Sequence, residues 1–369
     1  MSAPAERIRV ADDDHANPMP AGNRTSRRSF FQLGAGAALF CTIGGEEVDL
    51  SQPGAARKAD ALAARVARPP AAARIAQELP RPEPAPGGVR REYWVQARTT
   101  GWNIVPTGRD DWHGRRITGK TSFRAYVYQE MTPGFAAPKS GISMPGPTLY
   151  AEVGDVLVVH FRNADTRLRQ AVTMHPHGVR YTPEYDGAYL GRYSRAGGFV
   201  GPGEEFTYHW ECISESVGAW PYHDHGPNHT LNTFRGLFGA IVISEKGAKR
   251  PDLNYALMLH QLTPPVTGLN RAFQCINGRA YAGNTPTLKA KIGQDVAIHV
   301  FGMDSNFHDF HMHGHRWTDT GGAPTDSQTV GPAETVTARF TEDNPGRWLY
   351  HCHVFSHQDE GMTGWYDVE

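Results

Sequence analysis

L-Y-A-E-V-G-D-V-L-V-V-H-F, residues 149–161, parallels L-K-A-K-I-G-Q-D-V-A-I-H-V, residues 288–300, apart from one inserted residue. A second parallel links G-A-W-P-Y-H-D-H, residues 218–225, with G-R-W-L-Y-H-C-H, residues 346–353. Short strand-like runs separated by Gly, Pro and Asp turns continue from Val89 onward, without a long helical period. The repeat therefore predicts two β domains built on one plan.

The predicted domains are residues 89–245 and residues 250–369, each a Greek-key β-sandwich, so the fold class is all-β. A chain of 369 residues is long enough for two or three compact domains. Residues 46–88 are rich in Ala, Arg and Pro and are predicted to be a linker segment. Within it, residues 56–68 have a composition that allows one helix.

Residues 1–45 are predicted to be a signal region. T-S-R-R-S-F-F, residues 25–31, precedes a weakly apolar run that is too short to span a membrane, and together they resemble a twin-arginine export signal. We therefore expect export of the folded protein to the periplasm or the medium. A disordered basic tail is the alternative, because a small-x-small cleavage site is missing.

Composition excludes some classes of function and singles out histidine. The net charge is −1 and charges of both signs are mixed along the chain, so no nucleic-acid-binding patch is indicated. Four cysteines are too few for a disulfide scaffold. Eighteen histidines are unusual for a residue that is normally in the minority.

Many of these histidines form H-x-H pairs that are in register between the domains. H-P-H-G at 175–178 matches H-M-H-G at 311–314, and H-D-H at 223–225 matches H-C-H at 351–353. Residues i and i+2 of a strand face the same side, so each pair presents two adjacent imidazoles. Eight imidazoles without carboxylates suit copper, zinc or iron, and argue against magnesium or calcium.

Cys352 lies between His351 and His353 and must face the opposite side of their strand. Further candidate ligands of the same metal ion are His308, His357 and Met362. Two imidazoles, a thiolate and a weak thioether are the ligands of a blue-copper electron-transfer centre. The strand that contains residues 351–353 then connects the copper site that receives electrons to the histidine cluster.

The motifs H-P-H-G, Y-H-D-H, H-D-F-H-M-H and H-C-H-V-F-S-H-Q-D-E-G-M resemble the four copper motifs of multicopper oxidases. The two-domain length makes the chain most similar to bacterial two-domain laccases, over residues 89–369. The resemblance implies cupredoxin domains, four coppers per chain, and an enzyme that reduces dioxygen to water while oxidising phenolic or similar small donors one electron at a time.

The resemblance also implies a role for each motif residue. The type 1 copper ligands are His308, Cys352, His357 and Met362, the type 2 ligands are His175 and His311, and the two type 3 sets are His177, His223, His353 and His225, His313, His351. Electrons then pass through Cys352 to the neighbouring histidines. An axial Met implies a low-to-moderate potential.

The first domain departs from this pattern. Asp224 stands where the second domain has Cys352, and His308 and Met362 also lack counterparts, which are Val172 and Phe234. A second blue-copper site is therefore not expected. His229, the one matching residue, and His315 are interpreted as supporting or surface residues.

Two residues after the H-P-H-G motif receive tentative catalytic roles from the resemblance. Asp186 is a candidate to relay protons to the cluster, and Tyr181 a candidate to supply an electron. Packing of Tyr181 and a D-G turn at Asp186 are the structural alternatives.

Each domain holds only half of the cluster histidines, and the resemblance implies a homotrimer with the clusters between subunits. Cys212 and Cys275 either pair in an oxidising compartment or are two buried free thiols. A copper nitrite reductase, a metal-ion oxidase and a copper-handling protein are the alternative functions. The physiological donor cannot be deduced from the motifs.

Overall fold

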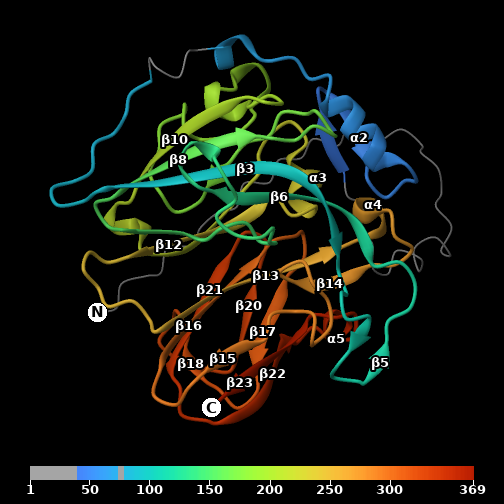
Figure 1. Ribbon diagram of the computed structural model, residues 1–369, viewed down its shortest axis with the longest axis vertical. Helices are drawn as coiled ribbons and strands as arrows, with labels where there is room; N and C mark the ends of the chain where they lie inside the picture. Colours follow the sequence, from blue (N-terminus) through green and yellow to red (C-terminus); the bar gives the residue numbers. More distant parts are fainter. Residues whose placement is uncertain (1–39, 74–78) are drawn as a thin grey trace, which may run out of the picture. The chain divides into compact units, whose positions relative to one another are not determined.

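The computed structural model describes residues 40–73 and 79–369. The twin-arginine motif lies outside the described residues. The described chain consists mainly of β-strands arranged in two sandwiches (Figure 1), which confirms the predicted all-β class with two Greek-key domains. No helix among the described residues is both long and apolar enough to cross a bilayer.

The first sandwich contains eight strands. They are β3 (Arg90–Asn103), β6 (Ser122–Met131), β7 (Leu149–Glu152), β8 (Val156–Asn163), β9 (His175–Pro176), β10 (Glu205–Glu211), β11 (Gly218–His223) and β12 (Phe238–Ser244). Its sheets have the strand orders β10-β8-β3-β6 and β7-β12-β11-β9. The short helical turns of this region are η3 (Pro133–Phe135), η4 (Gly191–Tyr193), η5 (Ala196–Gly198), η6 (Ser214–Ser216) and α3 (His229–Phe234).

The second sandwich contains nine strands. They are β13 (Leu253–Leu262), β14 (Phe273–Ile276), β15 (Leu288–Ala290), β16 (Asp295–Gly302), β17 (His308–Met312), β20 (Ser327–Val330), β21 (Thr335–Thr341), β22 (Gly346–Cys352) and β23 (Thr363–Val368). Its sheets have the orders β14-β13-β16-β21 and β15-β23-β22-β17-β20. The remaining elements are α4 (Pro264–Thr267), α5 (Phe355–Asp359) and the hairpin of β18 (Trp317–Thr318) with β19 (Pro324–Thr325).

The internal repeat gives both sandwiches the same topology. The repeated stretches form β7 and β8 in the first domain, and β15 and β16 in the second. β7 pairs in parallel with β12, as β15 does with β23. β8 pairs in parallel with β3, as β16 does with β13. The second domain therefore repeats the chain path of the first.

The tryptophans of the G-x-W-x-Y-H stretches pack on the glycines of the H-x-H-G motifs. A Cβ on Gly178 would lie 2.1 Å from Cδ2 of Trp220, and one on Gly314 would lie 2.9 Å from Cε3 of Trp348. Both glycines have φ near +70° (+73° and +72°), a conformation that other residues rarely adopt. The indole rings therefore fix the chain directly after each histidine pair.

The tyrosines of the same stretches have an equivalent role. A Cβ on Gly239 would lie 2.3 Å from Cζ of Tyr222, and one on Gly364 would lie 2.3 Å from Cζ of Tyr350. Both tyrosines are fully buried. Tyr222 directly precedes His223 in β11, and Tyr350 directly precedes His351 in β22. Because each ring packs on a glycine of the paired strand, it fixes the register of the two strands next to the histidine.

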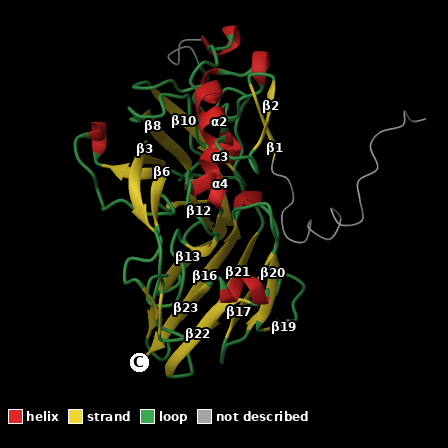
Figure 2. Cartoon of the chain, turned by 90° about the vertical axis from the view of Figure 1, so that its right-hand side faces the viewer, coloured by secondary structure: helices red, strands yellow, loops and turns green. Residues whose placement is uncertain are grey.

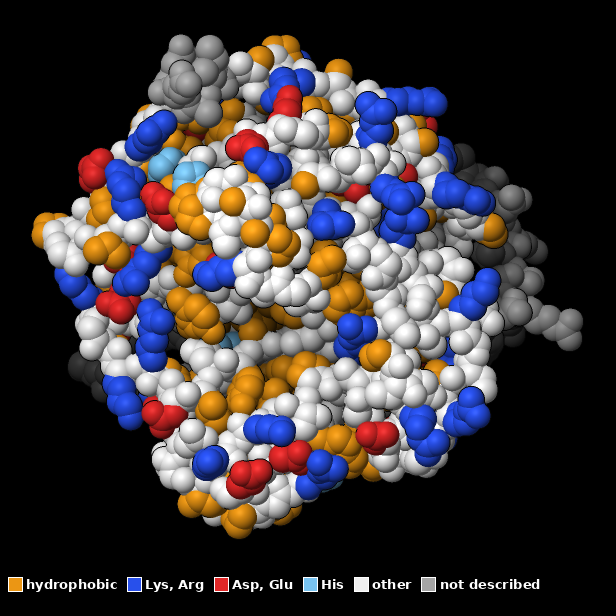
Figure 3. Space-filling model, viewed as in Figure 1, with side chains coloured by type: hydrophobic (Ala, Val, Ile, Leu, Met, Phe, Trp, Pro, Cys, Tyr) orange, Lys and Arg blue, Asp and Glu red, His pale blue; other side chains and the backbone are white. Residues whose placement is uncertain are grey.

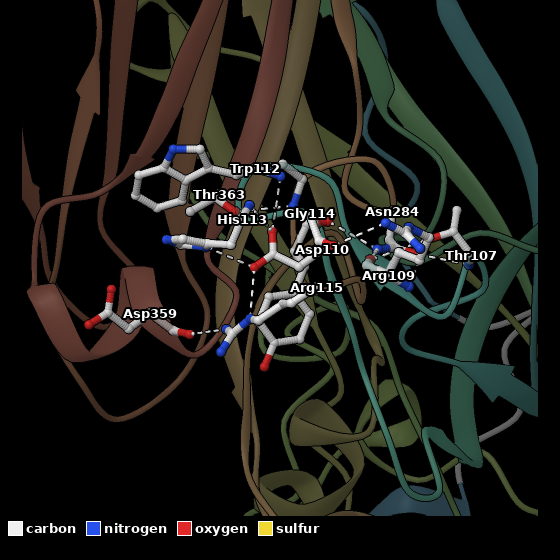
Figure 4. Close-up of polar contacts among 12 residues, drawn as sticks. Thr107, Arg109, Asp110, Trp112, His113, Gly114, Arg115, Asn284, Asp359 and Thr363 are labelled. Carbon is white, nitrogen blue, oxygen red and sulfur yellow. Dashed lines mark hydrogen bonds and ion pairs between the residues drawn. The ribbon is translucent and has the colours of Figure 1, made fainter.

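A hairpin of the first domain reaches onto the second. Its strands are β4 (Arg109–Asp110) and β5 (Arg115–Arg116). Arg115 Nη2 donates to the carbonyl of Asp359, at the end of α5, at 3.1 Å, and Asn284 Nδ2 donates to the carbonyl of Arg109 at 2.7 Å (Figure 4). The hairpin thereby contacts the helix that carries His357.

Asp110 organises this hairpin from within. Its side chain is buried, and its carboxylate accepts hydrogen bonds from the backbone N–H of Trp112 at 3.1 Å, His113 Nδ1 at 2.9 Å and Arg115 Nε at 3.1 Å (Figure 4). A buried carboxylate is stable only when it is paired in this way. The turn therefore keeps one shape where it meets the second domain.

The N-terminal described segment packs on the first sandwich. It contains the hairpin of β1 (Phe40–Ile43) with β2 (Glu46–Asp49), helix α2 (Ala55–Ala63), which overlaps residues 56–68 expected to allow a helix, and the turn η1 (Pro70–Ala73). Figure 2 shows α2 beside α3, where Asp60 forms an ion pair with Arg235 at 2.7 Å. The hairpin crosses residue 45, the expected boundary between signal and linker.

All four cysteines are free and buried. Of the two alternatives for Cys212 and Cys275, the structure has the free thiols. Burial raises the pKa of Cys212 to about 12 and that of Cys275 well above its ordinary value. Both thiols are therefore unreactive hydrophobic core residues.

Gly178→Ala should destabilise the protein by about 3 kcal/mol, because the new methyl group overlaps Trp220 and the left-handed backbone adds its own cost. Urea unfolding measures this loss. The control is Gly203→Ala, whose φ is +80° but whose Cβ would meet no atom within 4 Å. That variant should lose only about 1 kcal/mol. Equal losses in the two variants would contradict the packing role of Trp220.

Candidate metal centres

The four residues predicted to form the blue-copper site meet between three elements of the second domain. His308 begins β17, Cys352 ends β22, and His357 lies in α5. Cys352 Sγ lies 4.0 Å from His308 Nδ1 and 3.6 Å from His357 Nδ1. Met362 is fully buried in the same core cluster as Cys352. His357 alone is half-buried, so the site has one edge toward solvent.

A hydrogen bond behind His308 fixes the direction of its ring. Nε2 of His308 donates to Asp304 Oδ1 at 3.2 Å, and the other oxygen of Asp304 accepts the backbone N–H of Gln261 at 2.7 Å. This leaves Nδ1 of His308 facing the sulfur of Cys352. A carboxylate behind a histidine is the usual support of a metal-bound imidazole.

The environment of Cys352 favours the thiolate. Burial by itself raises the pKa of a thiol, but hydrogen bonds to His308, His357 and the backbone N–H of Asp309 outweigh it and lower the pKa of Cys352 to about 6. The thiol is therefore largely ionised at pH 7, which is the form that binds metals. A buried thiolate facing two imidazole nitrogens and a Met fits copper.

The first domain brings its four histidines together where β9 meets β11. His175 and His223 are directly paired across these strands. Nε2 of His177 lies 3.1 Å from Nε2 of His223. The ring of His175 lies 5.2–5.5 Å from the rings of His177, His223 and His225. The four imidazoles therefore form one compact set, defined here as the first half-site.

Backbone carbonyls orient these rings. Nδ1 of His175 donates to the carbonyl of Asp186 at 2.7 Å, and Nδ1 of His223 donates to that of Asp224 at 2.8 Å. The Nε2 lone pairs are then free for a metal. Burial lowers the pKa of His177 to about 4 and that of His223 to about 3. Both are neutral at pH 7, as metal binding requires.

The second domain repeats this arrangement where β17 meets β22. His311 and His351 are directly paired, and Nε2 of His313 lies 3.2 Å from Nε2 of His351. His311 Nδ1 donates to the carbonyl of Asp326 at 2.7 Å. The ring of His311 lies 5.3 Å from that of His353, which is exposed. These four residues are the second half-site.

Neither half-site alone contains a complete predicted ligand set. Each brings two Nε2 atoms into contact, as a shared metal ion requires, but the predicted third ligand of each type 3 set belongs to the other half-site. Among the described residues, no hydrogen bond or ring contact joins a histidine of the first half-site to one of the second. Likewise, no hydrogen bond or ring contact among the described residues joins His175 to His311, the two predicted type 2 ligands.

The first domain fills the place of its missing blue-copper site with hydrogen bonds. Asp224, the counterpart of Cys352, is fully buried. Its carboxylate accepts from the backbone N–H of Thr173 at 2.8 Å, that of Gly226 at 3.1 Å and Asn232 Nδ2 at 2.9 Å. These donors occupy the carboxylate, which explains how one copy of the repeat lacks a metal site without leaving a cavity.

His229 and His315 support the half-sites from behind. His229 stacks on His225 at 4.6 Å between ring centroids. His315 is buried, with Nδ1 2.8 Å from the carbonyl oxygen of His313 and Nε2 3.0 Å from Oε1 of Glu342. Glu342 in turn accepts a hydrogen bond from the hydroxyl of buried Tyr366 in β23, so His315 ties the His313 loop to the core.

Tyr181 and Asp186 both lie beside His175. Asp186 Oδ1 is 3.1 Å from His175 Nδ1, and the ring of Tyr181 is 6.0 Å from that of His175. Burial, followed by the charge of Asp186, raises the pKa of Tyr181. Their placement is compatible with the tentative roles, which stay predictions.

Sequence reasoning missed three acidic residues that orient ligands, namely Asp304, Asp326 and Glu342. Asp304 precedes His308 by four residues, which is a weak signal in an irregular segment. Asp326 acts through its backbone carbonyl, and Glu342 is 27 residues from the histidine that it contacts. Neither leaves a recognisable pattern in the sequence.

Comparison with known proteins identifies the family. Two family models described as multicopper oxidase match residues 140–248 and 254–369. The chain is 27% identical to the ferroxidase HEPHL1 of Homo sapiens, covering 77% of this chain and 30% of that protein. It is 29% identical to hephaestin of Homo sapiens, covering 76% and 30%. The chain thus spans about a third of these relatives.

Solved structures share the fold. A structure described as a multicopper oxidase has a TM-score of 0.60 at 22% identity, covering 76% of this chain and 89% of that one. The blue copper oxidase of Nitrosomonas europaea has a TM-score of 0.58 at 22% identity, covering 76% and 86%. A copper-containing nitrite reductase of Thermus scotoductus gives 0.56 at 18%, covering 76% and 62%.

These similarities confirm two cupredoxin-like domains and agree with the half-sites and the thiolate site described above. Members of this family are copper-dependent oxidoreductases, for which dioxygen is the acceptor. Because the two family models together match more than half of the sequence, the chain belongs to the multicopper oxidase family.

Proposed function

We propose that the protein is a laccase-like oxidase that removes single electrons from phenolic or similar small donors and reduces dioxygen to water. The observation that supports this most is the joint presence of four imidazoles in each of two half-sites and one buried thiolate, Cys352, between two histidines of the second half-site in the sequence. Copper held by these residues supplies the one-electron chemistry and the binding of dioxygen.

Strand β22 connects the two kinds of site. Because side chains alternate along a strand, Cys352 points into the core while His351 and His353 point to the second half-site. Only a few covalent bonds then separate the thiolate from the imidazoles. The half-buried edge of His357 is the proposed point of electron entry, since the other residues of that site are fully buried.

The residues near His175 are proposed to handle protons. The backbone carbonyl of Asp186 accepts a hydrogen bond from His175 Nδ1, and the side-chain carboxylate of Asp186 lies 3.1 Å from the same nitrogen. Forming water consumes protons, and a half-buried carboxylate beside the first half-site can deliver them. Tyr181, whose ring lies 6.0 Å from that of His175, is proposed as an auxiliary electron donor.

Assembly as a homotrimer is proposed, with the first half-site of one copy facing the second half-site of the next. The split ligand sets support this, since a head-to-tail ring closes such sites between copies. A large apolar side chain is exposed beside the second half-site: Phe355 is 70% exposed and contacts the exposed His353. Export by the twin-arginine route is proposed from the sequence motif alone.

Two alternatives share the fold. A copper nitrite reductase needs one catalytic copper beside a blue-copper site, so the complete set of eight histidines disfavours it. A metal-ion oxidase fits the same half-sites, and similarity to ferroxidases makes ferrous iron the second donor to test.

The protein reconstituted with copper should bind about four coppers per chain, absorb strongly near 600 nm, and consume dioxygen with a phenolic donor. Metal analysis, absorption spectroscopy and an oxygen electrode measure these properties. Cys352→Ser should abolish the absorption band, whereas Cys212→Ser, which removes another buried thiol, should keep it. About two coppers and no oxygen uptake would contradict the proposal and make nitrite the next substrate.

Mixing two inactive variants should restore activity if the cluster forms between copies. His177→Ala removes a ligand from the first half-site, and His313→Ala removes one from the second. After dissociation and reassembly at equal amounts, about a quarter of the interfaces should combine two intact half-sites. Oxygen uptake near a quarter of the wild-type rate is expected. No recovery, although mixed oligomers are shown by mass spectrometry, would place the cluster within one chain.

Asp186→Asn should lower the turnover number at least about tenfold, because the amide cannot deliver protons. Copper content and the absorption band should stay unchanged, which separates proton delivery from ligand loss. Turnover and copper content are measured together across pH. Full turnover at every pH would restrict Asp186 to a structural turn.

A further inference from the structure

A hollow of about 540 Å³ lies on the first domain, away from the histidines. Strands β3 and β6 and the loop after β8 surround it. Three of the residues that line it are arginines, namely Arg98, Arg124 and Arg167, and one is an acid, Asp165. Figure 3 shows several Lys and Arg side chains gathered over the region of β3 and β6, with few acidic side chains among them.

The guanidinium groups of the three arginines have no partner among the described residues. Within residues 40–73 and 79–369, none of them makes a hydrogen bond, an ion pair or a cation–π contact. Some other surface guanidinium groups are paired: Arg339 and Arg347 each form two hydrogen bonds to one aspartate, at 2.7–3.1 Å. What distinguishes the hollow is that three guanidinium groups without a carboxylate partner line it together.

Asp165 does not compensate this charge. It is 4% exposed, and its carboxylate accepts hydrogen bonds from the backbone N–H groups of Thr99, Leu168 and Arg167 at 3.2, 2.7 and 3.1 Å. The hydroxyl of Thr99 donates to it as well, at 2.7 Å. With both oxygens occupied, the carboxylate shapes the loop and has no lone pair directed at the guanidinium groups.

Three guanidinium groups that line one hollow create a local excess of positive charge, which attracts an anion. The whole chain has a net charge of −1, so a general excess of positive charge does not explain the cluster. Guanidinium groups match the oxygens of phosphate and sulfate in geometry and bind them through paired hydrogen bonds. The hydroxyl of Thr166 also lines the hollow and can donate to such a group.

We propose that this hollow binds a tetrahedral oxyanion, a phosphate or sulfate group, and that it is distinct from the metal centres. Its volume exceeds that of a single ion and falls within the range of small-molecule sites. The oxyanion is therefore either free or carried by a larger molecule. The proposal does not depend on the oxidase activity, because no residue of the half-sites or of the thiolate site lines the hollow.

The test uses the copper-loaded full-length protein in chloride buffer of constant ionic strength. Isothermal titration calorimetry with inorganic phosphate, pyrophosphate and sulfate measures binding of free oxyanions, and titration with heparin measures binding of a sulfated polymer. Saturable binding of at least one probe is expected. Binding of heparin without binding of the free ions would assign the oxyanion to a larger molecule.

Arg98→Gln combined with Arg124→Gln should weaken this binding about tenfold or more, because the variant loses the charged hydrogen bonds of two of the three guanidinium groups. The matched control combines Arg57→Gln with Arg116→Gln, two exposed arginines outside the hollow that also lack ion pairs. It removes the same charge and should leave the affinity unchanged. Unchanged oxygen uptake in both double variants verifies folding.

Two results would overturn the proposal. The first is the absence of saturable binding of every probe at constant ionic strength. The second is an equal loss of affinity in the two double variants, which would indicate a response to overall charge and not to this hollow.

Discussion

The two-residue period of strand β22 is the constraint on which the rest of the site depends. It places Cys352 in the core with His308 and Met362, and it places His351 and His353 on the other face. Strand β22 therefore carries the buried sulfur of Cys352 on one face and the imidazoles of the second half-site on the other. A shift of register by one residue would exchange these faces and destroy both sites. Tyr350, packed flat on Gly364, prevents that shift.

Duplication of the domain allowed the two copies to diverge at one point. In the second domain the position holds a thiolate whose pKa is lowered by two imidazoles. In the first it holds Asp224, which is satisfied by hydrogen bonds from Thr173, Gly226 and Asn232. Both solutions satisfy a buried polar group with hydrogen bonds, as burial requires. The half-sites are preserved in both copies because they lie at the strand ends and not in the core.

Backbone carbonyls and buried acids give the imidazoles their directions. His175, His223, His311 and His351 each donate from Nδ1 to a main-chain carbonyl, which leaves Nε2 as the metal-binding atom. In contrast, His308 is held at Nε2 by Asp304 and presents Nδ1 to the sulfur. The two kinds of centre therefore use opposite nitrogens, and a hydrogen bond behind each ring selects which one.

The sequence by itself determined the features that depend on local period. The repeat, the H-x-H spacing and the alternation around Cys352 predicted two β-sandwiches, the meeting of the thiol with His308, His357 and Met362, and the grouping of the histidines by domain. The sandwiches, the grouping of the histidines and the direction of Cys352 follow from the geometry of one strand or from comparison of two similar stretches, whereas His308, His357 and Met362 were assigned to the thiol by resemblance to the copper motifs. The roles of Tyr181 and Asp186 and the assembly stay predictions.

Only the tertiary structure decided what depends on residues far apart in the chain. Glu342 reaches His315, Arg115 reaches the end of α5, and Cys212 and Cys275 stay apart as free thiols. The unpaired arginines around Asp165 likewise come from two strands and a loop. Such contacts follow from how the sheets pack and where loops cross, and neither is recorded in a local pattern of polar and apolar residues.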